Sequence, residues 1–278
     1  MKKCRFIALL ALVALLIACS EQAKSAANDE IEIREEDGVY YSQFAKFDVA
    51  DLQDFDVSRT DAREIKAFLS DVDKAILNVS EYLDRPDWQQ RYLGKYGVED
   101  TLYIDIELTN GISRVHYPPL LILCNAKLYD KNHLPMTHEI THIICPNKTS
   151  RSLREGLAQY TQAKFAPQNL LFVGDAPVHQ VVKHYFATLN GEVFDAILNA
   201  VGSEMGKIDI SAFSAKENRA VFYNLSYSFV KYLIDQYGIE KFMTLYNAED
   251  LAAGYRAAYD ADYKSLIEEW VSFIEKSE

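Results

Sequence analysis

The pattern of apolar and polar residues changes its period along the chain, and each period predicts a different kind of element. Between residues 58 and 84 the apolar residues recur every three or four positions, after a start at Ser58 or Thr60. The residues of this apolar stripe are Ile65, Phe68, Leu69, Val72, Ile76, Leu77 and Leu83. The pattern therefore predicts a long amphipathic helix.

Further along, the period shortens to that of a strand. In TLYIDIELTN (101–110) every second residue is apolar, and Asn110-Gly111 is a strong signal for a hairpin turn. Residues 113–124 continue as extended segments, which Pro118-Pro119 should bend or interrupt. After residue 133 the pattern is helical to the end. Strands followed by helices predict an α+β fold, with a small antiparallel sheet and a mainly helical remainder.

The first eighteen residues, MKKCRFIALLALVALLIA, have a basic start and an apolar run that is too short to span a membrane comfortably. They predict a secretory signal. The run ends in LIAC (16–19), which resembles the bacterial lipobox. In such signals cleavage leaves a lipid-bearing cysteine, here Cys19, as the new N-terminus, and Ser20 after it implies sorting to the outer membrane. The alternative is an ordinary signal peptide with a chance cysteine.

Charge and cysteine content narrow the classes of partner. The signal contains three of the 29 basic residues and none of the 41 acidic ones, so the mature chain carries a net charge of −15. An acidic chain without basic blocks argues against nucleic-acid binding and against electrostatic attachment to anionic lipid.

Only Cys124 and Cys145 remain after loss of Cys4 and lipidation of Cys19. They can form a disulfide or stay as two buried thiols.

Candidate metal chemistry starts in HEITH (138–142). His138 and His142 are four residues apart, which on a helix places both imidazoles on one face, able to share a zinc ion. Glu139 lies about 100° round the helix, beside the metal, where it can take a proton from a water. Pro135 and Pro146 bound this helix, and its apolar face points away from the histidines. The plainer interpretation is a surface helix with two solvated histidines.

Glu155 is the expected third ligand. LREGLAQYTQAKF (153–165) predicts a second helix, buried along Leu153, Leu157 and Tyr160, with Glu155 on its other side. Gly156 should let the backbone approach a neighbouring element closely. Two histidines and one glutamate leave a fourth position open, as in catalytic zinc sites.

HEITH followed by REGLAQY resembles the gluzincin metallopeptidases, the peptidase-MA-like superfamily of zinc enzymes. The resemblance implies a zincin-type catalytic domain that binds one zinc ion through His138, His142 and Glu155, with Glu139 as general base and acid. The segment VFYNLSYSFVKYLIDQYG (221–238) is similar to a later helix of that family. That similarity implies that Tyr223 donates a hydrogen bond to the developing oxyanion, with Tyr227 as the substitute candidate. The loop between His142 and Glu155 is shorter than in the thermolysin and aminopeptidase branches.

These features predict a signal peptide (1–18), a flexible tether (19–38) and one gluzincin-like domain (39–278). Within the domain, the sheet and first helix occupy 58–132, the active-site helices 133–166, and a helical C-terminal part 167–278. The expected function is a lipid-anchored zinc metallohydrolase of the bacterial cell envelope that cleaves peptides or proteins. The alternative is a non-catalytic surface lipoprotein that binds protein or glycan. The remaining histidines are expected to have no catalytic role: His116, His133, His179 and His184.

Overall fold

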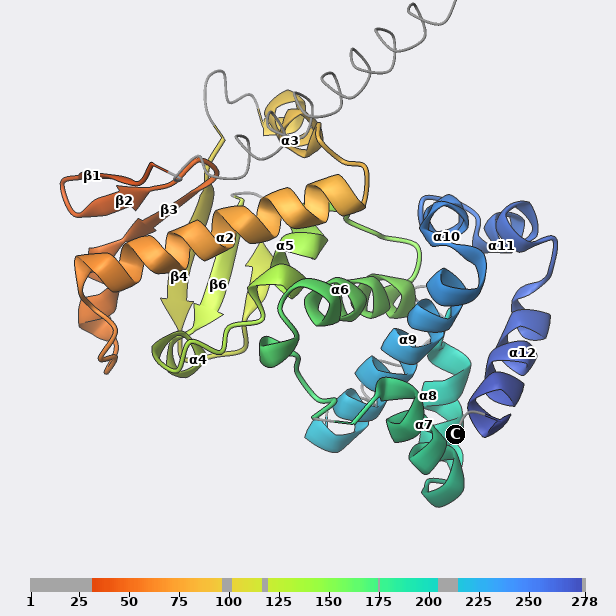
Figure 1. The fold of residues 1–278 in the computed structure, drawn as a ribbon. Helices are drawn as coiled ribbons and strands as arrows, with labels where there is room; N and C mark the ends of the chain where they lie inside the picture. Colours follow the sequence, from red (N-terminus) through yellow and green to blue (C-terminus); the bar gives the residue numbers. More distant parts are fainter. Residues whose placement is uncertain (1–31, 97–101, 117–119, 175, 205–214, 277–278) are drawn as a thin grey trace, which may run out of the picture.

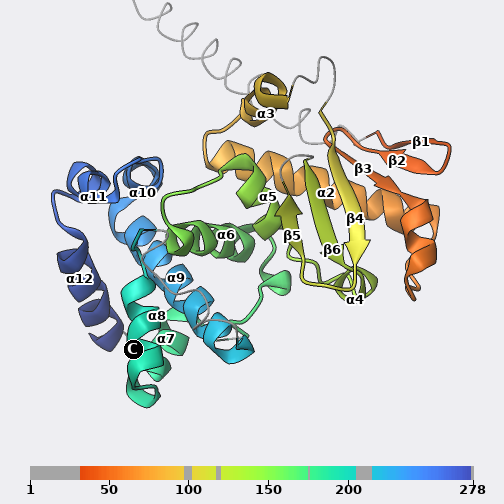
Figure 2. The same cartoon turned by 180° about the vertical axis from the view of Figure 1, so that it is seen from behind.

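The computed structural model describes residues 32–96, 102–116, 120–174, 176–204 and 215–276. It has an α+β fold in which one mixed sheet lies on one side and a group of helices on the other (Figure 1). The views from front and back agree that helices α6 to α12 lie beyond the β5 end of the sheet (Figure 2). The candidate site lies where these two parts meet.

The sheet has six strands in the order β1-β2-β3-β4-β6-β5. Their bounds are Arg34–Glu36 (β1), Val39–Tyr41 (β2), Ala45–Asp48 (β3), Ile104–Thr109 (β4), Arg114–His116 (β5) and Leu121–Asn125 (β6). A 3₁₀ turn, η1, covers Val49–Asp54. The central pairs β3–β4 and β4–β6 are parallel, whereas the outer pairs β1–β2, β2–β3 and β5–β6 are antiparallel.

The prediction of an antiparallel sheet with a hairpin at Asn110-Gly111 is therefore wrong. β4 and β5 are not neighbours, because β6 lies between them and pairs with both. The Asn125 side chain at the end of β6 donates to Gly111 O (2.6 Å) and fixes the turn against β6. A local turn signal indicates that the chain changes direction, but it does not indicate which strand pairs with the strand before the turn. Pro118-Pro119 lie outside the described residues.

The sheet also begins earlier than expected, because β1, β2 and β3 all precede residue 58, the start of the region assigned to the sheet and first helix. β1 at Arg34–Glu36 lies inside the segment 19–38 that composition assigns to a tether, and it pairs with β2. Residues 1–31, with the expected signal and Cys19, lie outside the described residues. Among the described helices, none is both long enough and apolar enough to cross a membrane.

The predicted long helix is α2, Ala62–Tyr82, which crosses one face of the sheet (Figure 1). Its N-cap is Asp61 rather than Ser58 or Thr60, since the Asp61 carboxylate accepts from Glu64 N at 2.9 Å. The expected stripe is buried except at Leu77, which is 43% exposed. α2 packs against the sheet and against α5, the helix that carries HEITH.

The remaining helices complete the fold around α5. Their bounds are Trp88–Tyr96 (α3), Ala126–Asp130 (α4), Met136–Ile144 (α5), Arg151–Phe165 (α6), Val178–Thr188 (α7), Glu192–Ala200 (α8), Lys216–Tyr237 (α9), Ile239–Tyr246 (α10), Leu251–Tyr259 (α11) and Tyr263–Lys276 (α12), with a short 3₁₀ turn η2 at Pro167–Asn169. α9 contacts α6, α7, α8, α10 and α12, and it is buried around most of its circumference. It is the central helix of this part.

Both remaining cysteines are free thiols, the second of the two alternatives left by the sequence. Cys124 is buried on β6, and its sulfur lies 3.7 Å from the sulfur of Met136. Cys145 is buried at the end of α5. Burial raises the pKa of both thiols. We therefore assign both residues to the core.

Stability of the helical part should depend on His179, which joins three helices. Its Nδ1 lies 2.9 Å from Ser228 Oγ on α9, which also accepts from the indole N–H of Trp270 on α12. Burial and, to a smaller extent, the charge of Lys231 lower the pKa of His179 to about 4, while the charge of Asp235 opposes this shift. The folded state thus takes up a proton less readily than the unfolded chain, whose histidine has a pKa of about 6.5.

Because only the unfolded state gains a proton between about pH 6.5 and about pH 4, stability should fall as the pH drops through this window. With allowance for the partial exposure of the ring, we expect this group to contribute about 1–2 kcal/mol to the loss. Urea unfolding of wild type and His179→Gln at several pH values measures the effect. The control is His184→Gln, an exposed histidine on the same helix. Identical pH profiles for wild type and His179→Gln would contradict the assignment.

Candidate metal centre

α5 is held in place by α6 rather than by a cap of its own. Pro135 precedes the helix and gives no side-chain cap, so the first backbone N–H groups need other partners. The N–H of His138 donates to Gln162 Oε1 on α6 at 3.0 Å. One turn further, the hydroxyls of Thr141 and Thr161 lie 2.6 Å apart between the two helices. The orientation of the histidine face is therefore fixed by buried polar contacts with the helix that carries Glu155.

α6 in turn is fixed against the central helix. Ser150 caps its start by accepting from Leu153 N, and the following turn brings Gly156 against α9. A Cβ at Gly156 would lie 2.5 Å from Ser226 O and 2.5 Å from Val230 Cγ2. The close approach expected of Gly156 is thus present, and it sets how deeply Glu155 sits, at 4% exposure.

Gly156→Ala should destabilise the protein by about 1–3 kcal/mol, because α6 and α9 must move apart to admit one methyl group. Helix propensity alone would make alanine stabilising at this position. A decrease in the free energy of unfolding would therefore indicate the close contact between the helices. Chemical unfolding measures it. Gly111→Ala is the control, since a Cβ there meets only Thr109 Oγ1 at an ordinary 3.4 Å. An unchanged or increased stability of Gly156→Ala would show that the helices do not meet at this residue.

Three side chains from these two helices converge at one point. His138 Nε2 and His142 Nε2 lie 3.1 Å apart, and Glu155 Oε2 lies 3.3 Å from the first and 3.4 Å from the second. Ligand atoms of a tetrahedral site with bonds of about 2.0–2.1 Å lie about 3.3–3.4 Å from one another. All three residues have little exposed surface. This buried group can hold a metal ion.

The Glu155 carboxylate is divided between two tasks. Oε2 faces the imidazoles, while Oε1 accepts from Arg154 Nη2 at 3.0 Å and Nε at 3.3 Å. Burial alone would raise the pKa of this carboxyl, but the charge of His142 and hydrogen bonds from both histidines lower the pKa well below its usual range. The group is therefore a carboxylate, the form that binds metal.

Glu139 and Tyr223 lie beside these three side chains. Glu139 is 6% exposed, and burial raises the pKa of its carboxyl, while the charges of His138 and His142 oppose this rise. The Tyr223 ring on α9 stacks on the His138 imidazole, with centroids 6.0 Å apart and planes inclined by 17°. Burial also raises the pKa of the Tyr223 hydroxyl, so that it stays protonated and can donate a hydrogen bond.

The group opens into a cleft of about 520 Å³. One part of its lining is Ser113, just before β5, with Arg114 and Val115 of β5, and the loop from Pro146 to Lys148 provides another. His138, Glu139, His142, Glu155 and Tyr223 all line the same cleft. Every predicted catalytic and metal-binding residue is thus brought together, in a space that can admit a ligand.

Other predicted candidates lie elsewhere. Tyr227 is buried and does not line the cleft, so Tyr223 is the one of these two candidates that lies at the site. None of the four remaining histidines lines it either: His116, His133, His179 and His184. No sequence signal marked Arg154, Gln162, Arg114 or Lys148, although the first two contact the group and the last two line the cleft. Arg154 stands next to Glu155 in REGLAQY, but nothing local showed that its guanidinium turns back onto that carboxylate.

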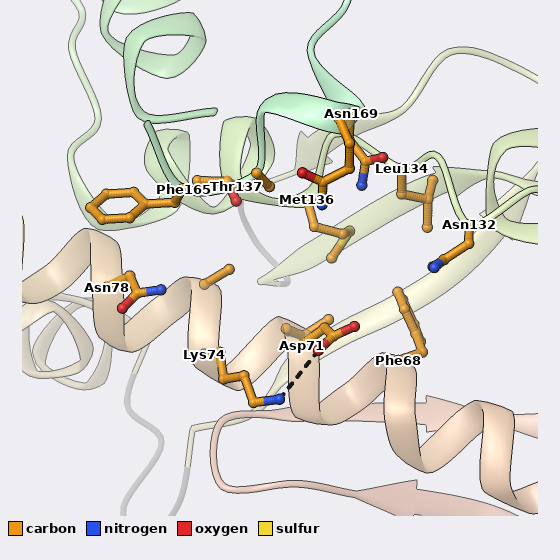
Figure 3. A pocket seen from close by; sticks show the side chains of 14 residues that line it. Phe68, Asp71, Lys74, Asn78, Asn132, Leu134, Met136, Thr137, Phe165 and Asn169 are labelled. Carbon is orange, nitrogen blue, oxygen red and sulfur yellow. Dashed lines mark hydrogen bonds and ion pairs between the residues drawn. The ribbon is translucent and has the colours of Figure 1, made fainter. Parts of the chain in front are cut away.

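A second pocket, of about 250 Å³, lies behind the start of α5 (Figure 3). It is formed by α2, by the segment before α5 and by the end of α6, and amide side chains such as Asn78, Asn132 and Asn169 surround it. Asp71 and Lys74 form an ion pair at its edge, 3.4 Å apart. No group of metal-binding side chains lines the described part of this pocket. It is separate from the metal centre.

The arrangement as a whole places three side chains that can hold a metal ion next to a carboxylate and a hydroxyl donor, all at the wall of an open cleft. Three protein ligands leave a coordination position for water or substrate, which separates catalytic from closed structural sites. The chain matches no family model, no curated protein and no solved structure.

Proposed function

We propose that the chain is a zinc metallopeptidase of the gluzincin type. The observation that carries this proposal is the spacing of 3.1–3.4 Å among His138 Nε2, His142 Nε2 and Glu155 Oε2, with Glu139 beside them in the cleft. Two imidazoles and one carboxylate in tetrahedral spacing favour zinc over calcium or magnesium, which prefer oxygen ligands and higher coordination numbers. Zinc held there supplies Lewis-acid polarisation of a carbonyl and lowers the pKa of a water toward 7.

The protein's own groups then have distinct tasks. The Glu139 carboxylate takes the proton of the attacking water and passes it to the departing amine. The Tyr223 hydroxyl donates a hydrogen bond to the oxyanion that forms on the substrate carbonyl. Arg154 holds Oε1 of Glu155, which keeps Oε2 directed at the metal position.

β5 supports a peptide as the substrate. It is the last strand of the sheet, it pairs only with β6 among the described strands, and its residues line the cleft. An unpaired strand edge offers backbone N–H and C=O groups to an extended peptide, which can add as a further strand. That addition would lay the peptide backbone along the cleft that contains Glu139.

We propose that the enzyme is attached to the cell envelope through lipid on Cys19, as the resemblance of LIAC to the lipobox implies. Residues 20–33, between that lipid and β1, would then set how far the domain can reach from the membrane. Labelling of intact cells with a fatty-acid analogue, compared with a Cys19→Ala protein, tests the attachment. Equal labelling of the two proteins would contradict it.

The central experiment is metal analysis and peptide cleavage on the purified mature domain. We expect about one zinc per chain, cleavage of a peptide library, loss of cleavage with a chelator and recovery when zinc is restored. Zinc binding without any cleavage would contradict the peptidase and leave a metal-containing binding protein. Cleavage that persists without metal would contradict the zinc mechanism.

A further inference from the structure

Charge is unevenly distributed around the cleft. Its described lining contains three cationic residues, Arg114, Lys148 and Arg154, and the only acidic residues in it are Glu139 and Glu155. Both of these acids belong to the proposed catalytic centre. The chain as a whole has 41 acidic and 29 basic residues. The described lining therefore carries one more positive than negative charge on a protein that is acidic overall, and a local positive excess attracts anionic ligands.

The three cations are not equivalent. Arg154 donates to Glu155 and is already committed to the metal centre. Arg114 uses Nε to contact His116 Nε2 at 2.9 Å, while its Nη groups have no partner among the described residues. Lys148 is exposed and has no hydrogen-bond or ion-pair partner in the described part of the chain. Arg114 and Lys148 are thus the two cations that can bind a ligand.

Both cations stand on rigid supports. Arg114 belongs to β5, which pairs with β6 along its length. Beside Lys148, the buried Asn147 side chain donates to Tyr246 O at 2.5 Å and accepts from the N–H groups of Thr149 and Ser150. These bonds tie the loop to α10, so the backbone at Lys148 is fixed although the side chain is exposed. A ligand gains from such placement because little ordering is needed on binding.

We propose that the cleft selects peptides that carry a carboxylate next to the cleaved bond, and that Arg114 and Lys148 recognise this group. The inference rests on the proposed peptidase function and names its substrate class. The carboxylate can be an acidic side chain or the free C-terminus of the peptide, since both present the same two oxygens to a guanidinium or an ammonium.

Binding rather than turnover gives the decisive test. Zinc-loaded Glu139→Gln protein is titrated with fluorescent peptides that share one sequence and differ at one position in Glu, Gln or Lys, each with a free or an amidated C-terminus. We expect the Glu peptides, the free C-termini or both to bind about three- to tenfold more tightly than their neutral counterparts, with a preference that shrinks as salt is added. A preference only for the Glu peptides identifies an acidic side chain as the source of the carboxylate, and a preference only for free C-termini identifies the peptide terminus.

Charge reversal assigns the recognition to the two residues. In the same background, Arg114→Glu and Lys148→Glu should each remove the preference. The matched changes Arg63→Glu on α2 and Lys127→Glu on α4 should keep it, since both of these residues lie outside the cleft lining.

Equal binding of all peptides, or a preference that survives both reversals, overturns the inference. If wild type cleaves peptides without regard to charge, the inference fails while the peptidase stands. If charged peptides bind but no peptide is cleaved, the peptidase fails while the recognition stands.

Discussion

Glu139→Gln is expected to bind zinc like the wild type and to lose about 10²- to 10⁴-fold of its peptide hydrolysis. The amide has nearly the same shape as the carboxylate but cannot accept the proton of the attacking water. Glu139 is not one of the three converging side chains, so the metal position should survive the change. The measurement is the initial rate of cleavage of one peptide, normalised to the zinc content of each protein.

Glu192→Gln, on the exposed side of α8, is the matched control and should keep wild-type activity. Because Glu139 is buried, circular dichroism and zinc content must show that the variant is folded and loaded. Equal activity of Glu139→Gln and wild type, at equal zinc content, would exclude this residue as the general base. Loss of zinc together with activity would instead place Glu139 among the groups that hold the metal.

Glu155→Gln is expected to weaken zinc binding by more than about 100-fold, since removing a ligand should cost more than the 10- to 100-fold typical of outer-shell changes. The neutral amide loses the attraction that the carboxylate exerts on the cation, and Arg154 loses its ion-pair partner. Competition with a chromophoric chelator measures the affinity. The same protein should show no rise in melting temperature when zinc is added.

The wild type provides the contrast for that experiment. A ligand that binds only the folded state stabilises it by about 4 kcal/mol at a concentration 1,000 times its Kd, so zinc should raise the melting temperature clearly. Arg154→Ala keeps the three ligand side chains but removes the contact to Oε1, and should lie between wild type and Glu155→Gln in affinity. Undiminished zinc binding by Glu155→Gln would show that the metal, if bound, sits elsewhere.

The local parts of the site could be predicted because they depend on residues close in sequence. A spacing of four places His138 and His142 on one face of any helix, and the flanking prolines mark where that helix can start and end. Gly156, which has no side-chain carbon, likewise indicated a close contact, and the structure identifies the partner as α9. These features follow from helix geometry and side-chain size alone.

Non-local pairing explains the errors. The alternation in residues 101–110 correctly indicated a strand, β4. Its two edges pair with β3, which lies much earlier in the chain, and with β6, which follows β5. The position of β6 between β4 and β5 depends on hydrogen bonds between strands, not on the residues of the turn at Asn110-Gly111. The turn signal therefore could not reveal the strand order. β1 was missed for the same reason, because a short polar segment becomes a strand only when β2 is present to pair with it.

Side-chain choices at the site were decided in the same way. Tyr223 and Tyr227 lie one turn apart on α9, and only the rotation of α9 against α6 determines which of them meets His138. The free state of Cys124 and Cys145 depends on where β6 and the end of α5 come to lie. Arg154, Arg114 and Lys148 had ordinary sequence contexts, and their roles come from the elements that surround them.

The sequence by itself determined the chemical types at the candidate centre, two imidazoles and two carboxylates on two helices, because helical periodicity converts spacing into a shared face. Only the tertiary structure decided that three of these groups converge within 3.4 Å, that Tyr223 joins them, and that the edge strand β5 and the cations Arg114 and Lys148 lie beside them. The physical reason is that convergence depends on packing between segments distant in sequence, where burial and hydrogen bonding select one arrangement among many that the local patterns allow.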